Sequence, residues 1–337
     1  MPRLSLSLAL CAAAVAASSV PRSSKLSTRK ATQYDRSCAT FTPDGSILQV
    51  EYACRAVARS RPALGIVAAD GVVLAAVPAA PPRGVATATP AAIEGDVRGP
   101  DAPPQLERLH AIDDHVACVV AGVLPDALAL VARARAAARA HRAAWGEPIP
   151  VALLAQQVCD VLQAATQEAG VRPFGASLLI AGWDAARGHQ LYRALPTGTC
   201  ARYRAAVIGG NARSSRRLER ALLRRFRAET GDDDGEDDDE ATPDDMLVDA
   251  DGDAAPLLDA TSQAARLLYE LPQRVRARGP TPGSGAAAVR VEPLEMLLVS
   301  HRAGRTFVHF VDPEIALQLR TARKPAAGSA AAGVDPS

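Results

Sequence analysis

The chain has 337 residues, of which 48% are hydrophobic and 22% are charged, so it is long enough for one large globular domain or two small ones. Its formal net charge of +1 argues against a nucleic-acid-binding protein, and no apolar run is long enough to cross a membrane. Aromatic residues make up only 4%, so we expect an aliphatic core.

The first thirty residues resemble a targeting segment. Arg3 precedes an apolar run over residues 4–17, and no acidic residue occurs before Asp35. Three interpretations stay open for residues 1–30: an unstructured leader or misassigned start, an organelle transit peptide, and a secretory signal.

The first clear element is a helix over residues 46–60, which follows the turn residues 43–45. Ser46 and Gln49 have the spacing of a capping box, in which each side chain bonds a main-chain amide at the helix start. The apolar residues Ile47, Val50, Cys54 and Val57 share one helical face.

The rest of the chain alternates between strand and helix patterns. Two apolar runs around Asp70-Gly71 predict a hairpin over residues 63–68 and 72–77. Further strands are expected at 115–123, 176–181, 189–194 and 203–208, and a last hairpin at 295–300 and 306–311; helices are expected at 125–141, 151–168, 211–227 and 257–271. This order predicts one α+β domain with sheets between helical layers.

Two insertions interrupt this domain, which we place at residues 31–322. Residues 81–104 are rich in Pro and Ala without periodicity. The segment 229–256 is acidic: residues 229–253 hold 14 Asp or Glu and no Lys or Arg, a pattern typical of a disordered insertion. A role in contacting a basic assembly partner is the alternative. Residues 323–337 are expected to form a disordered tail.

The region after the leader carries a family signature. Its residues are Tyr34, Asp35, Arg36, Ser37, Cys38, Ala39, Thr40, Phe41, Thr42, Pro43, Asp44 and Gly45, followed by Gln49, Val50, Glu51, Tyr52 and Ala53. This stretch closely resembles the N-terminal signature of proteasome alpha subunits, from which it departs mainly by Thr42 in place of Ser.

Further segments match the same family in register. They include Ile112 to Cys118, Arg172 to Gly175 and Gly182-Trp183-Asp184. Within the family the chain is most similar to the alpha type-4 group, also called alpha 3. The resemblance covers about residues 30–320 apart from the two insertions.

The resemblance implies a four-layer αββα sandwich of the N-terminal nucleophile hydrolase type. It also implies a subunit that joins other alpha subunits in a heteroheptameric ring, stacks on beta-type subunits and docks a regulatory particle or other activators. The expected role is ring assembly, gating of substrate access and activator docking in ubiquitin-dependent and ubiquitin-independent degradation. The expected location is cytoplasm and nucleus, with an organelle or the secretory route as the alternative that the leader leaves open.

The sequence predicts that this chain has no catalytic residues. A beta-type subunit needs a threonine freed at its N-terminus, just before the first hairpin strand. Here Arg61-Pro62 stands at that point, and Ser60 is the only hydroxyl nearby. The rival hypotheses are a self-processing threonine peptidase of the beta or bacterial type, and a degenerate paralogue that binds something else.

Three groups of site residues are implied by the resemblance. Tyr34, Asp35 and Arg36 would support the gate, unless they simply begin a strand. Gln49, Val50, Glu51 and Tyr52 lie on the helix that would contact the ring. Arg108 matches the family's activator-pocket lysine, and a solvated surface arginine is the alternative.

No cofactor or metal is expected. The six His residues lack metal-ligand spacing, and the acidic run at 249–260 lacks the Gly and the final Glu of a calcium loop. The six Cys are scattered and are predicted to be reduced thiols.

Overall fold

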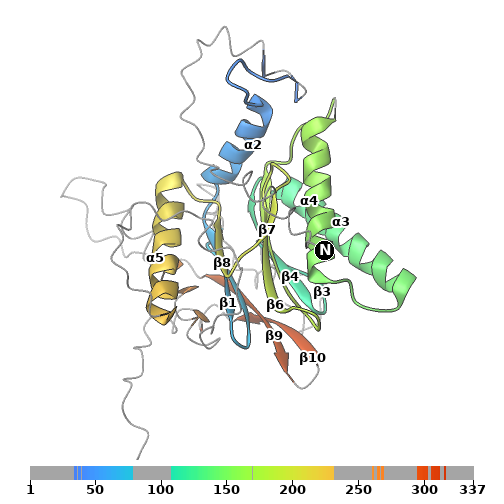
Figure 1. Cartoon of the computed structure of the whole chain (residues 1–337), viewed down its shortest axis with the longest axis vertical. Coiled ribbons are helices and arrows are strands. Elements are labelled where there is room, and N and C mark those ends of the chain that lie inside the picture. Colours follow the sequence, from blue (N-terminus) through green and yellow to red (C-terminus); the bar gives the residue numbers. More distant parts are fainter. Residues whose placement is uncertain are drawn as a thin grey trace, which may run out of the picture.

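The computed structural model describes residues 34–35, 37–38, 40–78, 108–168, 170–230, 260–261, 264–265, 267–268, 294–302, 305–311 and 315. Two antiparallel sheets lie face to face, with helices on both outer sides, as Figure 1 shows. The described part of the chain therefore forms the four-layer αββα sandwich that the resemblance implies.

Each sheet has five strands. The first has the order β10-β9-β2-β1-β8, and the second has the order β3-β4-β5-β6-β7. The strands of the first sheet are β1 (Ala63–Ala68), β2 (Gly71–Ala76), β8 (Ala205–Ile208), β9 (Glu295–Arg302) and β10 (Arg305–Val311). Those of the second are β3 (Leu109–Asp113), β4 (Val116–Gly122), β5 (Ala176–Asp184), β6 (Gly188–Ala194) and β7 (Cys200–Arg202).

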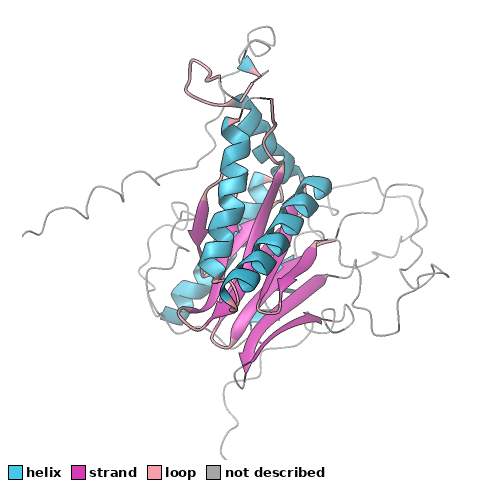
Figure 2. Cartoon of the chain, turned by 90° about the vertical axis from the view of Figure 1, so that its right-hand side faces the viewer, coloured by secondary structure: helices cyan, strands magenta, loops and turns pink. Residues whose placement is uncertain are grey.

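Helices α3 (Leu124–Trp145) and α4 (Val151–Gln167) cover the outer face of the second sheet, in front of the strands in Figure 2. Helix α5 (Ala212–Thr230) lies against the first sheet. Helix α2 (Leu48–Arg59) lies at one end of the sandwich, above both sheets in Figure 1.

The core has two parts, which follow from the alternation of side chains across each sheet. One part fills the space between the sheets and includes Leu64, Leu74, Leu179 and Leu191. It extends to Leu218 and Leu222 of α5. The other lies between the second sheet and helices α3 and α4. Nearly all of these residues are aliphatic, as the low aromatic content predicts.

Most of the predicted elements are confirmed within a few residues, the first and last hairpins and helices α3 to α5 among them. The prediction missed strand β3, whose five residues alternate irregularly between buried and half-buried positions. The predicted strand at 203–208 was too long, because β7 ends at Arg202 and β8 begins at Ala205.

The predicted capping box is wrong. Helix α2 begins at Leu48, and its N-cap Ile47 makes no side-chain cap hydrogen bond. Ser46 instead closes a turn with Thr42: its main-chain N–H donates to Thr42 Oγ1 at 3.0 Å, and its carbonyl accepts from the Thr42 N–H at 2.8 Å. The helix thus starts two residues after Ser46, and Ile47 between them has an extended backbone.

Several predicted segments lie outside the described residues. They are the leader 1–30, the insertion 81–104, residues 231–256 of the acidic insertion and the tail 323–337. Of the predicted helix 257–271, the six described residues are helical. Among the helices that the structure describes, none is both long and apolar enough to span a bilayer.

Candidate functional site

The start of β1 is where a nucleophile would have to lie. Ser60 is the hydroxyl residue that precedes Arg61-Pro62 in the chain, and its Oγ donates a hydrogen bond to the carbonyl of Val57 at 2.7 Å. Its main-chain N–H donates to the same carbonyl at 3.0 Å, which caps the end of α2. The Ser60 hydroxyl therefore terminates a helix.

A glycine pair covers this position. Gly210 N–H donates to the Ser60 carbonyl at 2.8 Å. Gly209 has φ +69°, and a Cβ there would lie 2.6 Å from both the Arg61 carbonyl oxygen and Ser60 Oγ. The Gly209 backbone therefore packs closely against Ser60 and Arg61. The close approach and the positive φ explain why a glycine stands at position 209.

Arg108 joins the same region from the side. Its Nη1 donates to the carbonyls of Pro62 at 3.1 Å and Val77 at 2.8 Å, and its Nε donates to the carbonyl of Val120 at 2.9 Å. The residue is only 6% exposed. One guanidinium therefore ties the start of β1, the end of β2 and strand β4 together.

The activator-pocket role of Arg108 stays a prediction, and in the isolated chain its side chain is buried. The Nε and Nη1 donors of Arg108 already serve main-chain carbonyls of this chain. The alternative of a solvated surface arginine is wrong, because the residue is buried. Sequence alone could not distinguish these cases, because burial of an arginine depends on which carbonyls converge on it.

The signature segment is tied to α2 by its N-terminal end. The side-chain amide of Gln49 donates to the main-chain carbonyl of Asp35. Thr42 Oγ1 both accepts from Ser46 N–H and donates to the Ser46 carbonyl, so the threonine hydroxyl makes the contacts that hold the turn. Arg36 lies outside the described residues.

Helix α2 leaves much of its surface open. Only Ala53 and Val57 are buried, while Ile47, Val50 and Cys54 of its apolar face are half-buried. On the polar side Glu51 pairs with Arg55 at 2.9 Å, and the Arg55 guanidinium lies 5.5 Å from the ring centroid of Tyr52. The chain itself covers only part of this helix.

An ion pair holds the loop beside this end of the molecule. The Asp126 carboxylate accepts from Arg172 Nη1 at 2.6 Å and Nη2 at 2.7 Å, and from Gly175 N–H at 2.9 Å. These hydrogen bonds, that of Arg172 above all, hold the pKa of Asp126 below its ordinary value, against the opposing effect of burial. Sequence matching singled out Arg172 to Gly175 but missed Asp126.

Exposed apolar side chains occur in the segments that flank this ion pair in the chain and in the signature segment. Val171 precedes Arg172 and accepts, through its carbonyl, a hydrogen bond from the thiol of Cys38 at 3.5 Å. Val171 is 47% exposed, and Leu124 and Leu128 at the start of α3 are 41% and 44% exposed. Phe41 in the signature segment is 64% exposed. These residues are called the apolar rim below.

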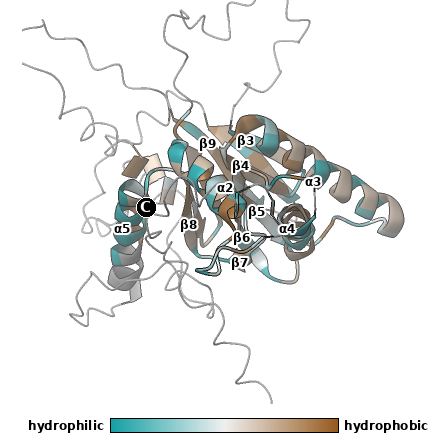
Figure 3. Ribbon diagram, turned by 90° about the horizontal axis from the view of Figure 1, so that it is seen from above, coloured by the Kyte–Doolittle hydropathy of each residue, from teal (hydrophilic) through white to brown (hydrophobic). Residues whose placement is uncertain are grey.

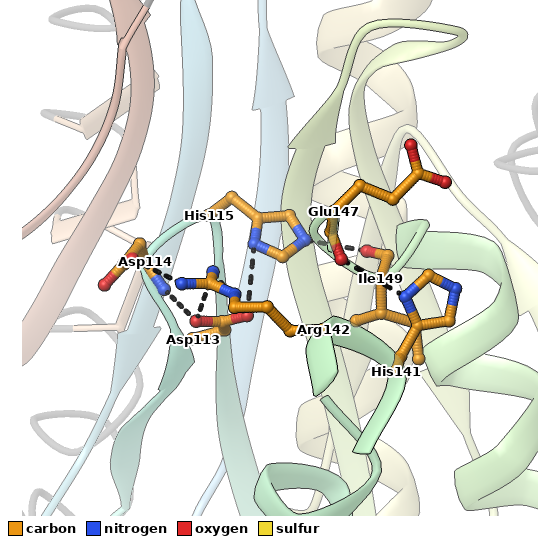
Figure 4. Close-up of polar contacts among 7 residues, drawn as sticks. All are labelled: Asp113, Asp114, His115, His141, Arg142, Glu147 and Ile149. Atoms are coloured by element: carbon orange, nitrogen blue, oxygen red, sulfur yellow. Dashed lines mark hydrogen bonds and ion pairs between the residues drawn. The ribbon is translucent and has the colours of Figure 1, made fainter. Parts of the chain in front are cut away.

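A second polar cluster lies at the other end of β3 and β4 (Figure 4). Arg142 Nη2 donates to both Asp113 carboxylate oxygens at 2.9 and 3.0 Å, and Nη1 donates to Asp114 at 3.3 Å. The buried His115 has its Nε2 2.7 Å from the Ile149 carbonyl and its Nδ1 3.7 Å from Asp113. The cluster pins the β3–β4 turn to the end of α3 and the loop before α4.

This cluster has the shape of a carboxylate and histidine pair, but both ring nitrogens of His115 face groups of the scaffold. Figure 4 shows no Ser, Thr or Cys among the cluster residues. We interpret it as a structural clamp. No group of three or more potential metal ligands occurs among the residues that the structure describes.

Comparisons with known proteins agree with this geometry. The family model for the N-terminal signature of proteasome alpha subunits matches residues 34–56, and the model for proteasome subunits matches residues 98–237. The chain is 38% identical over 186 residues to proteasome subunit alpha type-4-1 of Oryza sativa subsp. indica, covering 55% of this chain and 68% of that protein. Alpha type-4-A of Arabidopsis thaliana and alpha type-4 of Spinacia oleracea match over the same lengths with the same identity.

The chain belongs to the proteasome alpha-type subunit family. The alpha-specific signature separates the chain from beta-type subunits, so it is a non-catalytic subunit of the alpha ring. Its relatives support the alpha type-4 assignment. The hypothesis of a self-processing threonine peptidase is therefore not supported. In the structure the Ser60 hydroxyl caps the end of α2, and Arg61-Pro62 stand before β1.

Proposed function

We propose that this alpha-type subunit forms part of the wall and gate of the proteasome core, and that beta-type subunits perform the cleavage. The observation that carries the proposal is the α2 end of the molecule. There the family signature presents a half-covered apolar helix face next to the apolar rim.

The proposed ring contact uses α2 together with the rim. Gln49, Val50, Glu51 and Tyr52 are all half-buried in the isolated chain. Apolar surface gathered in one place and rimmed by polar groups is typical of a protein interface. The neighbours would be other alpha subunits of a heteroheptameric ring.

The contact is testable by substitution. Val50→Arg places a charge on the proposed interface and should block incorporation into the particle, while the variant chain still melts like the wild type. Phe307→Arg is the matched control, since Phe307 is 39% exposed on β10 at the far edge of the first sheet. Native electrophoresis of tagged particles measures incorporation. Equal incorporation of both variants would contradict the contact.

The proposed gate residues are Tyr34, Asp35 and Arg36. What supports this role is the bond from the Gln49 side chain to the Asp35 carbonyl, which holds the approach to the signature segment on α2. Gln49→Ala should raise basal hydrolysis of short peptides per assembled particle, with incorporation measured separately by native electrophoresis. Gln156→Ala, on the exposed side of α4, is the control. An unchanged basal rate for Gln49→Ala would argue against the gate.

We also propose activator partners and a cellular location for this subunit. Activators such as a regulatory particle would dock on the alpha ring, and Arg108 is the residue proposed for their pocket. We propose a location in cytoplasm and nucleus, in line with the intracellular role of such particles. Imaging of the chain tagged at its C-terminus would test this, and an organellar signal would overturn it.

A further inference from the structure

Helix α5 carries a stripe of arginines. Arg213, Arg216, Arg217, Arg220 and Arg224 are spaced by three or four residues, so at 100° per residue they fall within an arc of about 100°. Over 11 residues the stripe extends about 17 Å along the helix axis. These five residues are called the arginine stripe.

The stripe faces away from the sheet. The opposite side of α5 carries Leu218 and Leu222, which are 2% and 0% exposed in the core under the first sheet. Glu219 is the only acidic residue between 212 and 228, and its carboxylate lies 3.9 Å from Arg193 of β6. In Figure 3 α5 shows its hydrophilic colouring on the outside of the molecule.

The stripe borders a groove of about 830 Å³. All five arginines line it, and its apolar side includes Leu218 and Leu267. Like charges at i,i+4 destabilise a helix, whereas guanidinium groups bind carboxylates bidentately. A groove of this composition is built for an anionic ligand that can extend along several turns.

The chain itself supplies such an anion. Residues 229–253 carry 14 Asp or Glu and no Lys or Arg, and they begin at the C-terminal end of α5. The chain is next described at Ala260, which is buried in the same core as Leu222, and Leu267 lies in the groove. The described residues on either side of 231–259 therefore lie at the end of α5 and in the core beneath it.

The connecting length is sufficient. Residues 231–259 can extend up to about 3.3 Å each, several times the length of the stripe. A tethered ligand also experiences an effective concentration of about a millimolar, which favours it over an external anion.

We propose that the arginine stripe is a docking site for an acidic peptide and that its occupant is this chain's own segment 229–253. Docking neutralises the cationic face of α5 and keeps other polyanions away from it. The alternative occupants are an external polyanion or an acidic segment of another protein.

The test uses the full chain and a synthetic, fluorescent peptide of residues 229–253. In one variant every Asp and Glu of this segment is replaced by Asn or Gln. Fluorescence anisotropy should show that the peptide binds this variant about tenfold or more tightly than the wild type, because the competing tethered segment is lost. Adding the five substitutions Arg213→Gln, Arg216→Gln, Arg217→Gln, Arg220→Gln and Arg224→Gln should abolish that gain.

Net charge must be controlled, since the acid replacement makes the chain strongly cationic. Five exposed arginines outside α5 provide the matched control: Arg55, Arg59, Arg139, Arg187 and Arg305. Their replacement by Gln should leave the gain in place. Equal peptide binding by the wild type and the acid-free variant would overturn the proposal. So would tight binding of inorganic polyphosphate to the wild type at the stripe, because the groove would then be open to external anions.

Discussion

Replacing Arg108 provides the sharpest test of how the start of β1 is held. The buried guanidinium donates three hydrogen bonds to the carbonyls of Pro62, Val77 and Val120. Hydrogen bonds from a charged donor contribute about 1.5–3 kcal/mol each, and they are not additive. We expect Arg108→Met to lower the free energy of unfolding by about 3–5 kcal/mol, because it keeps the apolar stem but leaves three buried carbonyls without this donor.

The effect should be visible in thermal unfolding of the purified full chain, followed by circular dichroism. For a domain of this size 1 kcal/mol corresponds to about 2–4 °C, so the Tm should fall by about 6–20 °C. Arg108→Lys should fall in between, since one ammonium cannot reproduce the planar fork. Arg139→Met is the control: its side chain is exposed on α3, and such substitutions change stability by about 0.5 kcal/mol or less.

The result also decides between two roles for Arg108. If Arg108→Met melts like the wild type while the assembled particle loses stimulation by an activator, the reasoning from burial is refuted and Arg108 is a docking cation.

Three further outcomes follow from the described contacts. Gly209→Ala should lower the free energy of unfolding in urea by at least about 1 kcal/mol more than Gly146→Ala does. Both glycines have positive φ, but only a Cβ at Gly209 would meet backbone at 2.6 Å. Equal losses of stability would contradict the close packing of Gly209 on Arg61. The ion pair of Asp126 lowers the pKa of that carboxyl, so its stabilisation is present above the unfolded pKa of about 3.9 and is lost as pH falls through the lower folded-state value. Asp126→Asn should therefore be less stable than the wild type by about 1–2 kcal/mol at pH 7, and the difference should shrink in acid; a difference that does not change with pH would exclude the ion pair as its source. Burial raises the pKa of the Cys118 thiol to about 12, whereas the hydrogen bond with Cys159 lowers the pKa of Cys200. Iodoacetamide at pH 8 should therefore modify Cys200 before Cys118 in the native chain and should label Cys118 only in urea. Labelling of Cys118 ahead of Cys200 in the native chain, read by peptide mass spectrometry, would contradict this order.

The sequence predicted those elements whose signal is local. The hairpin around Asp70-Gly71 and the helices α3 and α4 have clear turn residues and periodic apolar positions, and each appears in the structure within a few residues. The capping box failed because Thr42 competes for Ser46, a contact between residues four apart that the pattern of the box does not include. Strand β3 was missed because its pattern is short and irregular.

The candidate site was less accessible to sequence reasoning. Motif matching located the signature segment and the absence of a nucleophile before β1, and both follow from residue identity alone. The burial of Arg108 and the partnership of Asp126 with Arg172 depend on residues 12 to 46 positions apart that only the folded sheets bring together. The need for glycine at position 209 could not be predicted, because it depends on Arg61, which lies before β1 and far away in the sequence.

One measurement tests the central claim, that this chain is a non-catalytic member of the alpha ring. The tagged chain is purified under native conditions and treated with an inhibitor probe that reacts covalently with N-terminal threonines, and the labelled subunits are identified by mass spectrometry. We expect a large particle in which other subunits carry the probe, while this chain is unlabelled and its Ser60–Arg61 peptide bond is intact. A probe attached to this chain at a new terminus near residue 61 would contradict the claim.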